Sequence, residues 1–430
     1  MSNLPKYACG SESHLSRRSF LEGATAGAVS LLGFHNMARA EGSQALASAQ
    51  KHVVVFNLHG GVSQLETWDP KPGTVTGGPF QRIQTSAPGV EICELLPHTA
   101  KVMHHLALVR GLNTSAADMG DHGKGYYTME TGRKQTPGFE YPALGSAFAY
   151  HLNPPDSPLP GYIQLNSGAA FPQEAAFLGP RYAGMALPGT GTPANLLRPE
   201  SVNDLADARR RAMRAKISGR FEQGRKDSML EAYNQSHDQA AKLLAKKDVF
   251  DFSKMSASDE DRYGKHEFAK HCRMALRLIE QGVTFVKVGH TNYDTHSENF
   301  NFHIEQLGEF DRPFATFVGD LADRGLLQHT LVIVMSEFGR TPRINHLVGR
   351  DHWGTAWSVA LGGAGIKGGA VSGKTSDDGT KVIDREVHSG HLFHTYYRAV
   401  GLDPTKNFYD NGRPTEKADP KAEALTEILA

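Results

Sequence analysis

Five short, largely apolar runs, spread along the whole chain, constrain the fold more than any other feature of this sequence. They lie at residues 53–58, 106–110, 283–288, 330–335 and 359–363. Runs of this kind are typical of strands buried on both faces of a parallel sheet. Helical patterns at residues 298–324 and 389–400 alternate with them, and another short strand is expected at 162–165. This order predicts an α/β fold with a mostly parallel central sheet that helices cover on both faces.

Two stretches between these runs differ in composition. Residues 137–199 are rich in Gly and Pro, which predicts a loop-heavy surface over the functional site. Residues 202–281 carry charges, Ala and Leu at helical spacing, and we expect three helices there, at about 202–218, 228–247 and 262–281. Nothing in them indicates chemistry, so this segment is predicted to be a solvated helical cap or insertion.

The first forty residues have the order of a twin-arginine export signal. The pair Arg17-Arg18 precedes a Gly- and Ala-rich apolar stretch at 24–34, and Ala38-Arg39-Ala40 has the small-residue pattern of a cleavage site. The apolar stretch is too short for a permanent membrane anchor. We therefore expect the twin-arginine translocase as a partner, cleavage after Ala40, and a periplasmic or otherwise exported domain at 41–430. The alternative is a disordered N-terminus with a chance arginine pair.

Charge and cysteine content exclude several classes of protein. Lys and Arg total 46, as do Asp and Glu, whereas a general nucleic-acid binder needs an excess of basic residues. Three cysteines are too few for a disulfide scaffold. Cleavage would remove Cys9, and the separation of Cys93 and Cys272 leaves open whether those two pair. The 21 histidines make a metal site a hypothesis worth testing.

Charged or imidazole side chains follow each of the first four predicted strands and precede the fifth. The first strand is followed by His59, Glu66 and Asp69, and the second by Asp121 and His122. The third is followed by His290, Asp294 and His296, the fourth by Glu337 and Arg340, and Asp351 and His352 precede the fifth. Because functional groups of open α/β sheets gather beyond the carboxyl ends of the strands, we expect them to converge. Such N and O ligands suit Zn, Mn or Fe better than Mg or Ca. The sequence therefore predicts a site for one or two divalent ions, with Zn the first choice.

Two segments resemble the alkaline phosphatase and sulfatase superfamily. The sequence from Thr330 to Gly339 resembles that superfamily's "TLVIVTADHG" strand and turn, with Glu337 and Phe338 where the family has metal-binding Asp and His. The segment from Asp351 to Gly362 resembles the one that leads into the next strand.

Over the whole mature chain, the motifs at 59–63, 67–72, 294–296, 336–342 and 351–353 resemble a twin-arginine-exported bacterial family, "domain of unknown function 1501". That family is a branch of the same superfamily. The resemblance implies an alkaline-phosphatase-like three-layer sandwich with a helical insertion.

The resemblance also implies a ligand set. Asp294, His296 and His352 correspond to one metal site, with Asp351 beside them. A second site would be built from His59, Glu337 and His122, because the superfamily's phosphatases use two metals.

His122 stands where those phosphatases carry a Ser nucleophile, and no Ser or Thr replaces it. Three interpretations stay open: a metal ligand, a nucleophile that forms a phosphohistidine-like intermediate, or a hydrogen-bonded residue without a catalytic part.

Other charged residues have two interpretations each. Arg340 is the best candidate to hold an anionic substrate, or else it pairs with Glu337 or Asp351. Lys71 and Lys124 are weaker candidates of the same kind. Glu66 and Asp69 either accept hydrogen bonds from ligand histidines or belong to a turn. His388, His391 and His394, three residues apart, either form a third metal site or lie in a packed final helix.

Two functions follow. The first is a periplasmic metal-dependent hydrolase that cleaves a small anionic phosphate or sulfate ester through metal-bound water. The alternative is a catalytically inactive member of the superfamily that acts as a metal-stabilised binding or assembly protein. The missing Ser and the Phe at position 338 motivate the alternative.

Overall fold

The computed structural model describes residues 50–118, 120–166, 172–187, 202–223, 234, 237, 240–244, 246–251, 256–410 and 413–430. The chain divides into two units, residues 1–46 and 47–430. The expected export signal and its cleavage site after Ala40 lie outside the described residues. So do residues 188–201 and most of the helix expected at 228–247.

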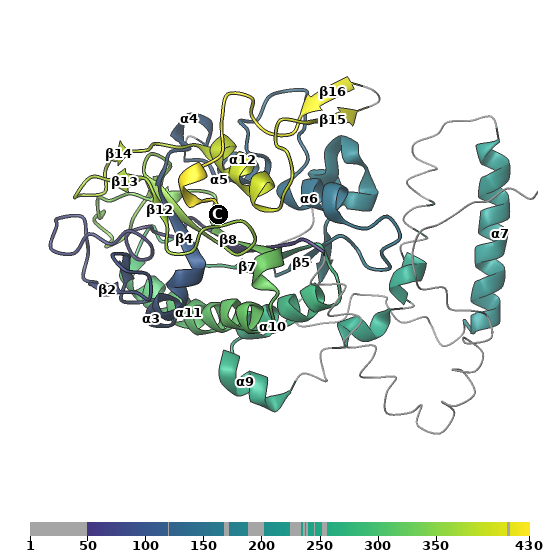
Figure 1. Cartoon of the computed structure of the whole chain (residues 1–430), viewed down its shortest axis with the longest axis horizontal. Coiled ribbons are helices and arrows are strands. Elements are labelled where there is room, and N and C mark those ends of the chain that lie inside the picture. Colours follow the sequence, from purple (N-terminus) through teal and green to yellow (C-terminus); the bar gives the residue numbers. More distant parts are fainter. Residues whose placement is uncertain are drawn as a thin grey trace, which may run out of the picture. The chain divides into compact units, whose positions relative to one another are not determined.

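An eight-stranded sheet forms the centre of the second unit (Figure 1). Its strands, in spatial order, are β12 (Val371–Ser372), β4 (Leu106–Leu112), β11 (Trp357–Gly362), β8 (Thr330–Met335), β1 (His52–Leu58), β7 (Phe285–His290), β5 (Tyr162–Leu165) and β6 (Met185–Leu187). β1 runs parallel to both of its neighbours, β7 and β8. β11 runs antiparallel to β4 and β8, whereas the other pairings are parallel. The predicted mostly parallel α/β sheet is therefore confirmed.

Alternate residues of β1 belong to two separate cores, one on each face of the sheet. Val54 and Phe56 pack with the layer of α3 (Pro97–Val102), α10 (Glu267–Glu280) and α11 (Asn299–Asp323). Val53 and Val55 pack on the other face, with α5 (His122–Thr131), α6 (Leu144–Leu152) and α12 (Ser389–Ala399). Figure 1 shows the two helical layers on opposite sides of the sheet. Since successive side chains of a strand point to opposite faces, an all-apolar strand requires two covering layers.

The Phe56 ring illustrates the packing on the α10–α11 face. Its centroid lies 5.1 Å from that of Phe314 and 5.2 Å from that of Phe317, both with edge-to-face geometry. Burying an aromatic side chain of this size contributes about 1.5–3 kcal/mol, and edge-to-face pairs add about 0.5–1.5 kcal/mol. The end of β1 is therefore held firmly against α11, directly before the chain turns into His59.

The C-terminal helix of segment 202–281 is buried, whereas the sequence predicts the whole segment to be a solvated cap. α7 (Asp204–Glu222) is capped by Asn203, whose side chain accepts a hydrogen bond from the Ala206 amide, and α9 (Ala257–Tyr263) follows it. α10, in contrast, is buried along one face, on which Phe268, Cys272 and Ile279 lie. Their spacing of four and seven residues forms an apolar stripe, so α10 covers the sheet rather than belonging to a solvated cap.

The Gly- and Pro-rich stretch also contains more regular structure than expected. α6 lies within it, and Leu144 and Phe148 of that helix are fully buried. A short apolar run does not by itself distinguish a buried helix from a strand, which is why the helix was not predicted. Cys93 and Cys272 are both free and buried, and burial raises the pKa of Cys93 to about 12.

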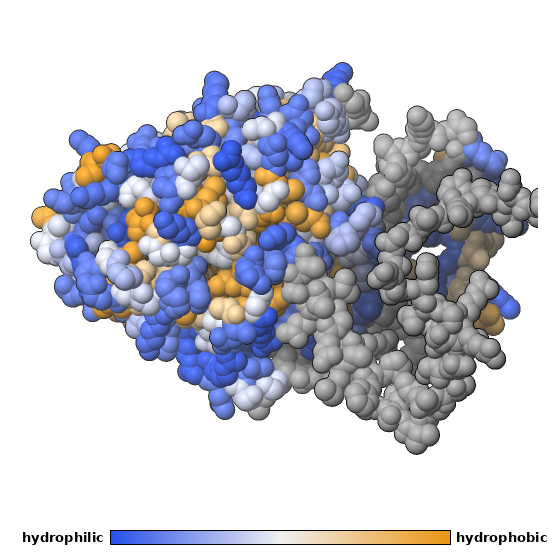
Figure 2. All heavy atoms as spheres, in the orientation of Figure 1, coloured by the Kyte–Doolittle hydropathy of each residue, from blue (hydrophilic) through white to orange (hydrophobic). Residues whose placement is uncertain are grey.

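Other short elements lie outside the central sheet. Besides short 3-10 helices, the described residues contain α4 (Ser115–Asp118) and four antiparallel pairs: β2 (Arg82–Gln84) with β3 (Glu91–Cys93), β9 (Gly339–Arg340) with β10 (His352–Trp353), β13 (Lys374–Thr375) with β14 (Val382–Asp384), and β15 (Asn407–Asp410) with β16 (Arg413–Glu416). Polar side chains cover most of the face seen in Figure 2, with apolar patches between them. No helix among the described residues is both long and apolar enough to cross a membrane.

Candidate metal centre

Three adjacent parallel strands, β8, β1 and β7, deliver their following turns to one edge of the sheet. β1 leads into His59, β7 leads towards Asp294, and β8 leads into Glu337. Backbone hydrogen bonds join these turns, since the His59 amide donates to the His290 carbonyl at 2.8 Å. The Gly60 amide donates to Glu337 Oε1 at 2.9 Å. The expected convergence at the carboxyl ends of the strands is therefore present for these three turns.

His352 reaches the same edge from the opposite direction. It lies in β10, paired in register with Arg340 of β9, and precedes β11, the strand that runs antiparallel to β8. Because β11 is reversed, its beginning rather than its end lies beside the ends of β1 and β8. His352, which precedes β11, therefore lies at the same edge of the sheet as the residues that follow β1 and β8.

His122 is brought to the site by the first turn of α5. Asp121 caps this helix by accepting a hydrogen bond from the Lys124 amide at 2.9 Å. One turn on, Gly125 faces Glu337, and a Cβ there would lie 2.9 Å from the Glu337 carbonyl oxygen. The helix therefore approaches the β8 turn more closely than a larger residue allows.

Three ligand-type atoms meet at the centre of this edge. His296 Nε2 and His352 Nε2 lie 3.0 Å apart, and they lie 3.2 Å and 3.1 Å from Asp294 Oδ1. Three ligands around a tetrahedral zinc ion, with bonds of about 2.0–2.1 Å, are separated by about 3.3 Å. These three atoms have the spacing that a single cation between them requires.

The outer nitrogens of the two histidines fix which atoms face the centre. His352 Nδ1 lies 2.7 Å from the Gly120 carbonyl oxygen, which can only accept, so Nδ1 carries the proton. His296 Nδ1 likewise donates to Asp351 Oδ1 at 2.8 Å. In the neutral imidazoles both Nε2 atoms thus present lone pairs to each other and to a carboxylate oxygen. A cation fits this arrangement, because the two Nε2 lone pairs face each other without a donor between them, while Asp294 Oδ1 accepts from Arg340 on its other side.

His122 stands on the other side of Asp294. Its Nε2 lies 3.4 Å from Asp294 Oδ2, and its Nδ1 donates to Glu337 Oε1 at 2.8 Å. Ligand atoms of His122, Asp294 and His352 all lie within 4.8 Å of one another. The hydrogen bond to Glu337 is the main cause that raises the pKa of His122 above its ordinary value.

Arg340 lies beneath Asp294 and is fully buried. Its Nε donates to the Gly61 carbonyl at 2.9 Å and its Nη1 to the Arg350 carbonyl at 3.0 Å, while Nη2 contacts the Gly60 carbonyl and the Asp294 carboxylate. Burial alone raises the pKa of Asp294, but the hydrogen bond and charge of Arg340 outweigh it and lower the pKa to about 2. The guanidinium thus faces protein acceptors, and its ion pair is with Asp294 rather than with Glu337 or Asp351.

His59 lies apart from this cluster. Its ring is stacked 6.0 Å from that of Tyr126, its Nδ1 lies 3.4 Å from Asn57 Nδ2, and its buried Nε2 has no hydrogen-bond partner among the described residues. Burial is the main cause that lowers its pKa to about 4. Of the predicted metal residues, the structure brings together Asp294, His296 and His352, with Asp351 as the acceptor behind His296 and Glu337 as the acceptor behind His122.

Glu66 and Asp69, with Lys71, form ion pairs within the protein. Glu66 binds Arg350 at 2.8 Å with both side chains fully buried, and Asp69 binds Lys71 at 3.0 Å. In these ion pairs neither Glu66 nor Asp69 accepts a hydrogen bond from a ligand histidine. The charge of Lys71 is paired with Asp69.

The three histidines near the C-terminus belong to the start of α12. His388 caps the helix by accepting from the Gly390 amide, and His391 Nδ1 accepts from the His388 amide in return. His394 Nε2 bonds the Asp419 carbonyl at 2.8 Å. The spacing of three residues between His388 and His391 thus forms a reciprocal helix cap. The structure therefore fits the interpretation that the three histidines belong to the packed final helix.

Several supporting residues were missed by the sequence analysis. The Gly120 carbonyl orients His352, and Ser336 Oγ accepts from the Gly61 and Val62 amides at 3.0 Å and 3.1 Å. Arg350 anchors the loop before His352 through Glu66. Ser336 and Arg350 each adjoin a predicted site residue in sequence, and this adjacency is the signal by which they could have been found.

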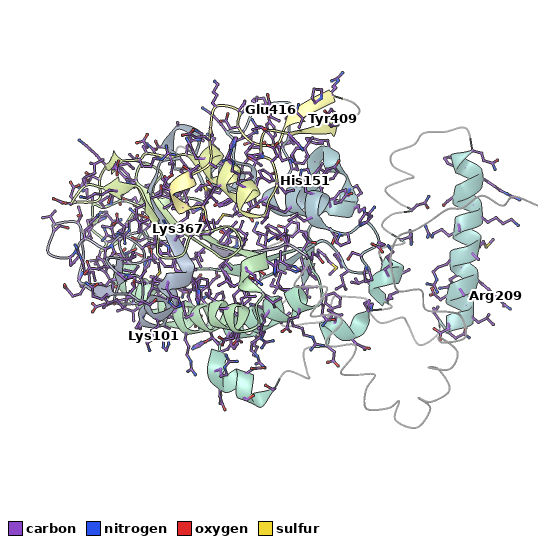
Figure 3. The ribbon with its side chains drawn as sticks, in the orientation of Figure 1. Lys101, His151, Arg209, Lys367, Tyr409 and Glu416 are labelled. Atoms are coloured by element: carbon purple, nitrogen blue, oxygen red, sulfur yellow. The ribbon has the colours of Figure 1, made fainter. Side chains whose placement is uncertain are left out.

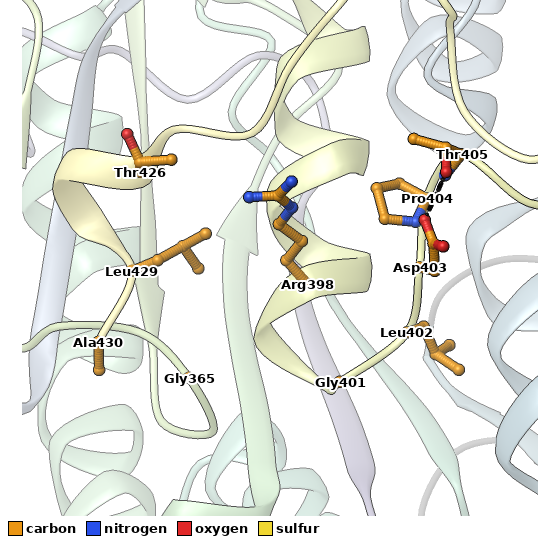
Figure 4. A pocket seen from close by; sticks show the side chains of 10 residues that line it. All are labelled: Gly365, Arg398, Gly401, Leu402, Asp403, Pro404, Thr405, Thr426, Leu429 and Ala430. Atoms are coloured by element: carbon orange, nitrogen blue, oxygen red, sulfur yellow. Dashed lines mark hydrogen bonds between the residues drawn. The ribbon is translucent and has the colours of Figure 1, made fainter.

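A separate cavity of about 790 Å³ lies at the other end of the sheet (Figure 4). Its lining residues are Gly365, Arg398, Gly401, Leu402, Asp403, Pro404, Thr405, Thr426, Leu429 and Ala430. Gly362, which ends β11, pairs with Val332 near the start of β8, so this cavity is remote from the metal centre. Among the described residues, no group of three potential metal ligands lines it.

The family model described as "Protein of unknown function (DUF1501)" matches residues 50–429. The chain belongs to this family. No curated protein matches the sequence.

Solved structures that resemble this DUF1501 protein include members of the alkaline phosphatase and sulfatase superfamily. They include the protein Ps i-CgsB (12% identity, 82% of this chain and 73% of that one, TM-score 0.40). The PsFucS1 sulfatase from Pseudoalteromonas sp. is also similar, with 12% identity over 85% of this chain and 72% of that one and a TM-score of 0.36. A protein in the alkaline phosphatase superfamily from Vibrio parahaemolyticus has 12% identity over 89% of this chain and 71% of that one, with a TM-score of 0.37. At TM-scores below 0.5 these likenesses are loose, and the fold stands on the chain's own sheet and covering helices.

Proposed function

We propose that this DUF1501 protein is a periplasmic, metal-dependent hydrolase that acts on a phosphate or sulfate ester. The observation that carries the proposal is the convergence of His296 Nε2, His352 Nε2 and Asp294 Oδ1, with separations of 3.0–3.2 Å. Export by the twin-arginine translocase, with cleavage after Ala40, is part of the same proposal and rests on the N-terminal sequence.

Asp294, His296 and His352 would hold the cation, with Zn preferred over Mn and Fe for an N₂O ligand set. A divalent cation here supplies a Lewis acid that polarises the ester and the attacking water. Asp351 and the Gly120 carbonyl keep the two Nδ1 protons turned outwards, which holds both Nε2 atoms in the ligating orientation.

His122 is the residue of this chain best placed to move a proton. Glu337 fixes the Nδ1 proton, so the second nitrogen, Nε2, faces the Asp294 carboxylate and the surrounding solvent. The side chain is 42% exposed, which leaves Nε2 within reach of a substrate. Glu337 raises the pKa of His122 and so favours the doubly protonated ring. We assign to this imidazolium the donation of its Nε2 proton to the leaving oxygen of the ester, after which the ring is neutral and keeps its Nδ1 proton on Glu337.

Arg340 contributes by positioning rather than by substrate contact. Its donors hold the Asp294 carboxylate and the carbonyls of Gly60 and Gly61, so one buried guanidinium links the turn after β7 to the turn after β1. A small anionic ester would therefore be held mainly at the cation position.

The test combines elemental analysis with an ester screen on the exported, untagged protein. We expect bound divalent metal in the wild type and turnover of aryl phosphate or aryl sulfate esters, both lost in Asp294→Asn and His352→Ala. His98→Ala, an exposed histidine on α3, serves as the matched control and should retain both. Full turnover in rigorously metal-free protein would contradict the proposal.

A second candidate function is a metal-stabilised binding or assembly protein without catalysis. The buried Arg340 favours it, because that side chain is fully buried and four of its five donors face acceptors of the protein. His122 also favours it, because as a fourth ligand it would close the coordination shell, as in structural zinc sites. Metal that raises the melting temperature of the wild type but not of Asp294→Asn, with no turnover of any ester, would support this candidate.

A further inference from the structure

We infer that this protein holds one cation rather than the two that its superfamily resemblance implies. The inference rests on the proposed metal centre and concerns the second ligand set, His59, Glu337 and His122. In a two-metal hydrolase such a set clamps a second ion about 3.5–4 Å from the first. Here Glu337 is bound within the protein, His122 lies with Asp294 and His352 of the first site, and His59 lies apart from both.

Glu337 is the first of these residues, and its carboxylate is already bound within the protein. Oε1 accepts from the Gly60 amide at 2.9 Å and from His122 Nδ1 at 2.8 Å, and Ser336 Oγ lies 2.9 Å from Oε2. The side chain is 5% exposed. A cation bound at Oε1 would have to displace the Gly60 amide, which would then be left without its acceptor, and one bound at Oε2 would have to displace the Ser336 hydroxyl.

Phe338 closes the space beside Glu337. Its ring is fully buried, and its centroid lies 4.9 Å from that of His122 and 4.5 Å from that of His352. A phenyl ring offers no ligand atom, and it packs against both imidazoles, whose own centroids lie 4.3 Å apart. The Phe338 ring therefore forms an apolar wall against which both imidazoles pack.

His59 is backed by a buried ion pair. Tyr126, on whose ring His59 is stacked, accepts a hydrogen bond from Lys287 Nζ at 2.7 Å. Lys287 is 1% exposed at its side chain and lies 2.6 Å from Glu130 Oε1. Because Lys287 and Glu130 are paired, the Glu130 carboxylate is engaged and does not serve as a further ligand for His59. Among the described residues, ligand atoms converge as a group of three at His122, Asp294 and His352 and not at His59.

The charges around the centre also suit one divalent ion. Asp294, Asp351 and Glu337 supply three carboxylates, and the Arg340 guanidinium neutralises one of them. The two remaining negative charges match one divalent cation. A second would leave an excess of two positive charges in a partly buried site, which is costly.

Titration of metal-free protein with Zn²⁺, followed by native mass spectrometry, tests the inference. We expect one ion per wild-type chain, one ion per chain in Glu337→Gln and in His59→Asn, and at least a 100-fold loss of affinity in Asp294→Asn. Circular dichroism spectra verify that each variant is folded, and the wild-type stoichiometry decides the matter if a variant is not.

Two tightly bound ions in the wild type, falling to one in Glu337→Gln or His59→Asn, would overturn the inference and leave the proposed hydrolase intact. One ion without turnover of any ester would leave the inference standing and overturn the hydrolase. No bound ion would overturn both.

Discussion

The Nε2 atoms of His296 and His352 face each other at 3.0 Å, and both outer Nδ1 atoms are held by acceptors, Asp351 and the Gly120 carbonyl. Two imidazoles in this relation have a fixed tautomer in their neutral state. The arrangement gives the site a ligating geometry before any ion arrives, so the entropy of ordering the ligands is lost on folding rather than on binding.

Loss of the acceptor behind His296 should weaken metal binding without abolishing it. Asp351→Asn removes the carboxylate that holds the Nδ1 proton of His296. Changes of this kind typically lower metal affinity by about 10–100-fold. Competition with a chromogenic zinc chelator measures the effect. Asp384→Asn, an exposed acid in β14, should bind as the wild type does, and equal affinities in all three proteins would refute the role given to Asp351.

Gly125 and Gly308 form a matched pair for testing the contact between α5 and the β8 turn. A methyl group at Gly125 would lie 2.9 Å from the Glu337 carbonyl oxygen and from a Phe338 ring carbon, whereas one at Gly308 in α11 meets nothing within 4 Å. We expect Gly125→Ala to cost about 1–3 kcal/mol of stability and Gly308→Ala to add about 0.5–1 kcal/mol. Urea denaturation provides both values. An unchanged free energy of unfolding in Gly125→Ala would mean that α5 can move away from the β8 turn without cost.

Arg340→Lys should destabilise the protein although it keeps the charge. Lysine cannot reproduce the donors that Arg340 directs to the carbonyls of Gly61 and Arg350. Buried acceptors left without a donor cost about 1–3 kcal/mol each. We expect a lower urea midpoint and weaker zinc binding, because Asp294 loses its anchor. Arg343→Lys, at an exposed position, is the control, and identical midpoints would show that the buried hydrogen bonds are replaceable.

Stability should fall in mild acid because buried histidines are neutral in the folded protein. His151, on α6 next to the β15–β16 pair (Figure 3), stacks on Phe408, and burial lowers its pKa to about 4. The unfolded chain, with a pKa near 6.5, takes up this proton first. The contribution of neutral His151 to the free energy of unfolding is therefore complete above pH 6.5 and is lost as the pH falls through 4.

The comparison of the wild type with His151→Phe isolates this contribution. Between pH 6.5 and 4, the free energy of unfolding of the variant should decline less steeply than that of the wild type. Measurements at pH 8, where the imidazole is neutral in both states, separate the effect of packing from that of titration. Parallel curves over the whole range would exclude His151 as a source of acid sensitivity.

The sheet was predictable because its strands are apolar on both faces. The runs at 53–58 and 330–335 match β1 and β8 almost residue for residue. The direction of β11 was not predictable, since a strand buried on both faces has the same composition whichever way it runs. α10 was placed wrongly in a solvated cap because its stripe of Phe268, Cys272 and Ile279 is interrupted by charged residues on the outer face.

The metal centre was only partly predictable, because a sequence shows residue types but not donor directions. The pattern of Asp294 and His296 indicated a possible pair of ligands, and its geometry fits one. Arg340 has the right chemistry for an anion, but whether a guanidinium faces a cavity or backbone carbonyls depends on how closely three turns approach one another. Glu337 likewise resembles a ligand in sequence, and only the positions of Gly60 and His122 reveal its hydrogen bonds.

The reversed direction of β11 separates the shape of the site from the stability of the sheet. The chain leaves β8, passes the centre in the segment 341–351, and enters β11 from the site side, with His352 placed before the strand begins. Insertions or substitutions at the exposed residues 346–348 of this segment can therefore remodel the edge of the site, while Arg350 and Asp351 keep their partners and the paired strands stay in register. Relatives that differ in specificity are expected to vary in the length and charge of this segment, and to keep β8 and β11 unchanged.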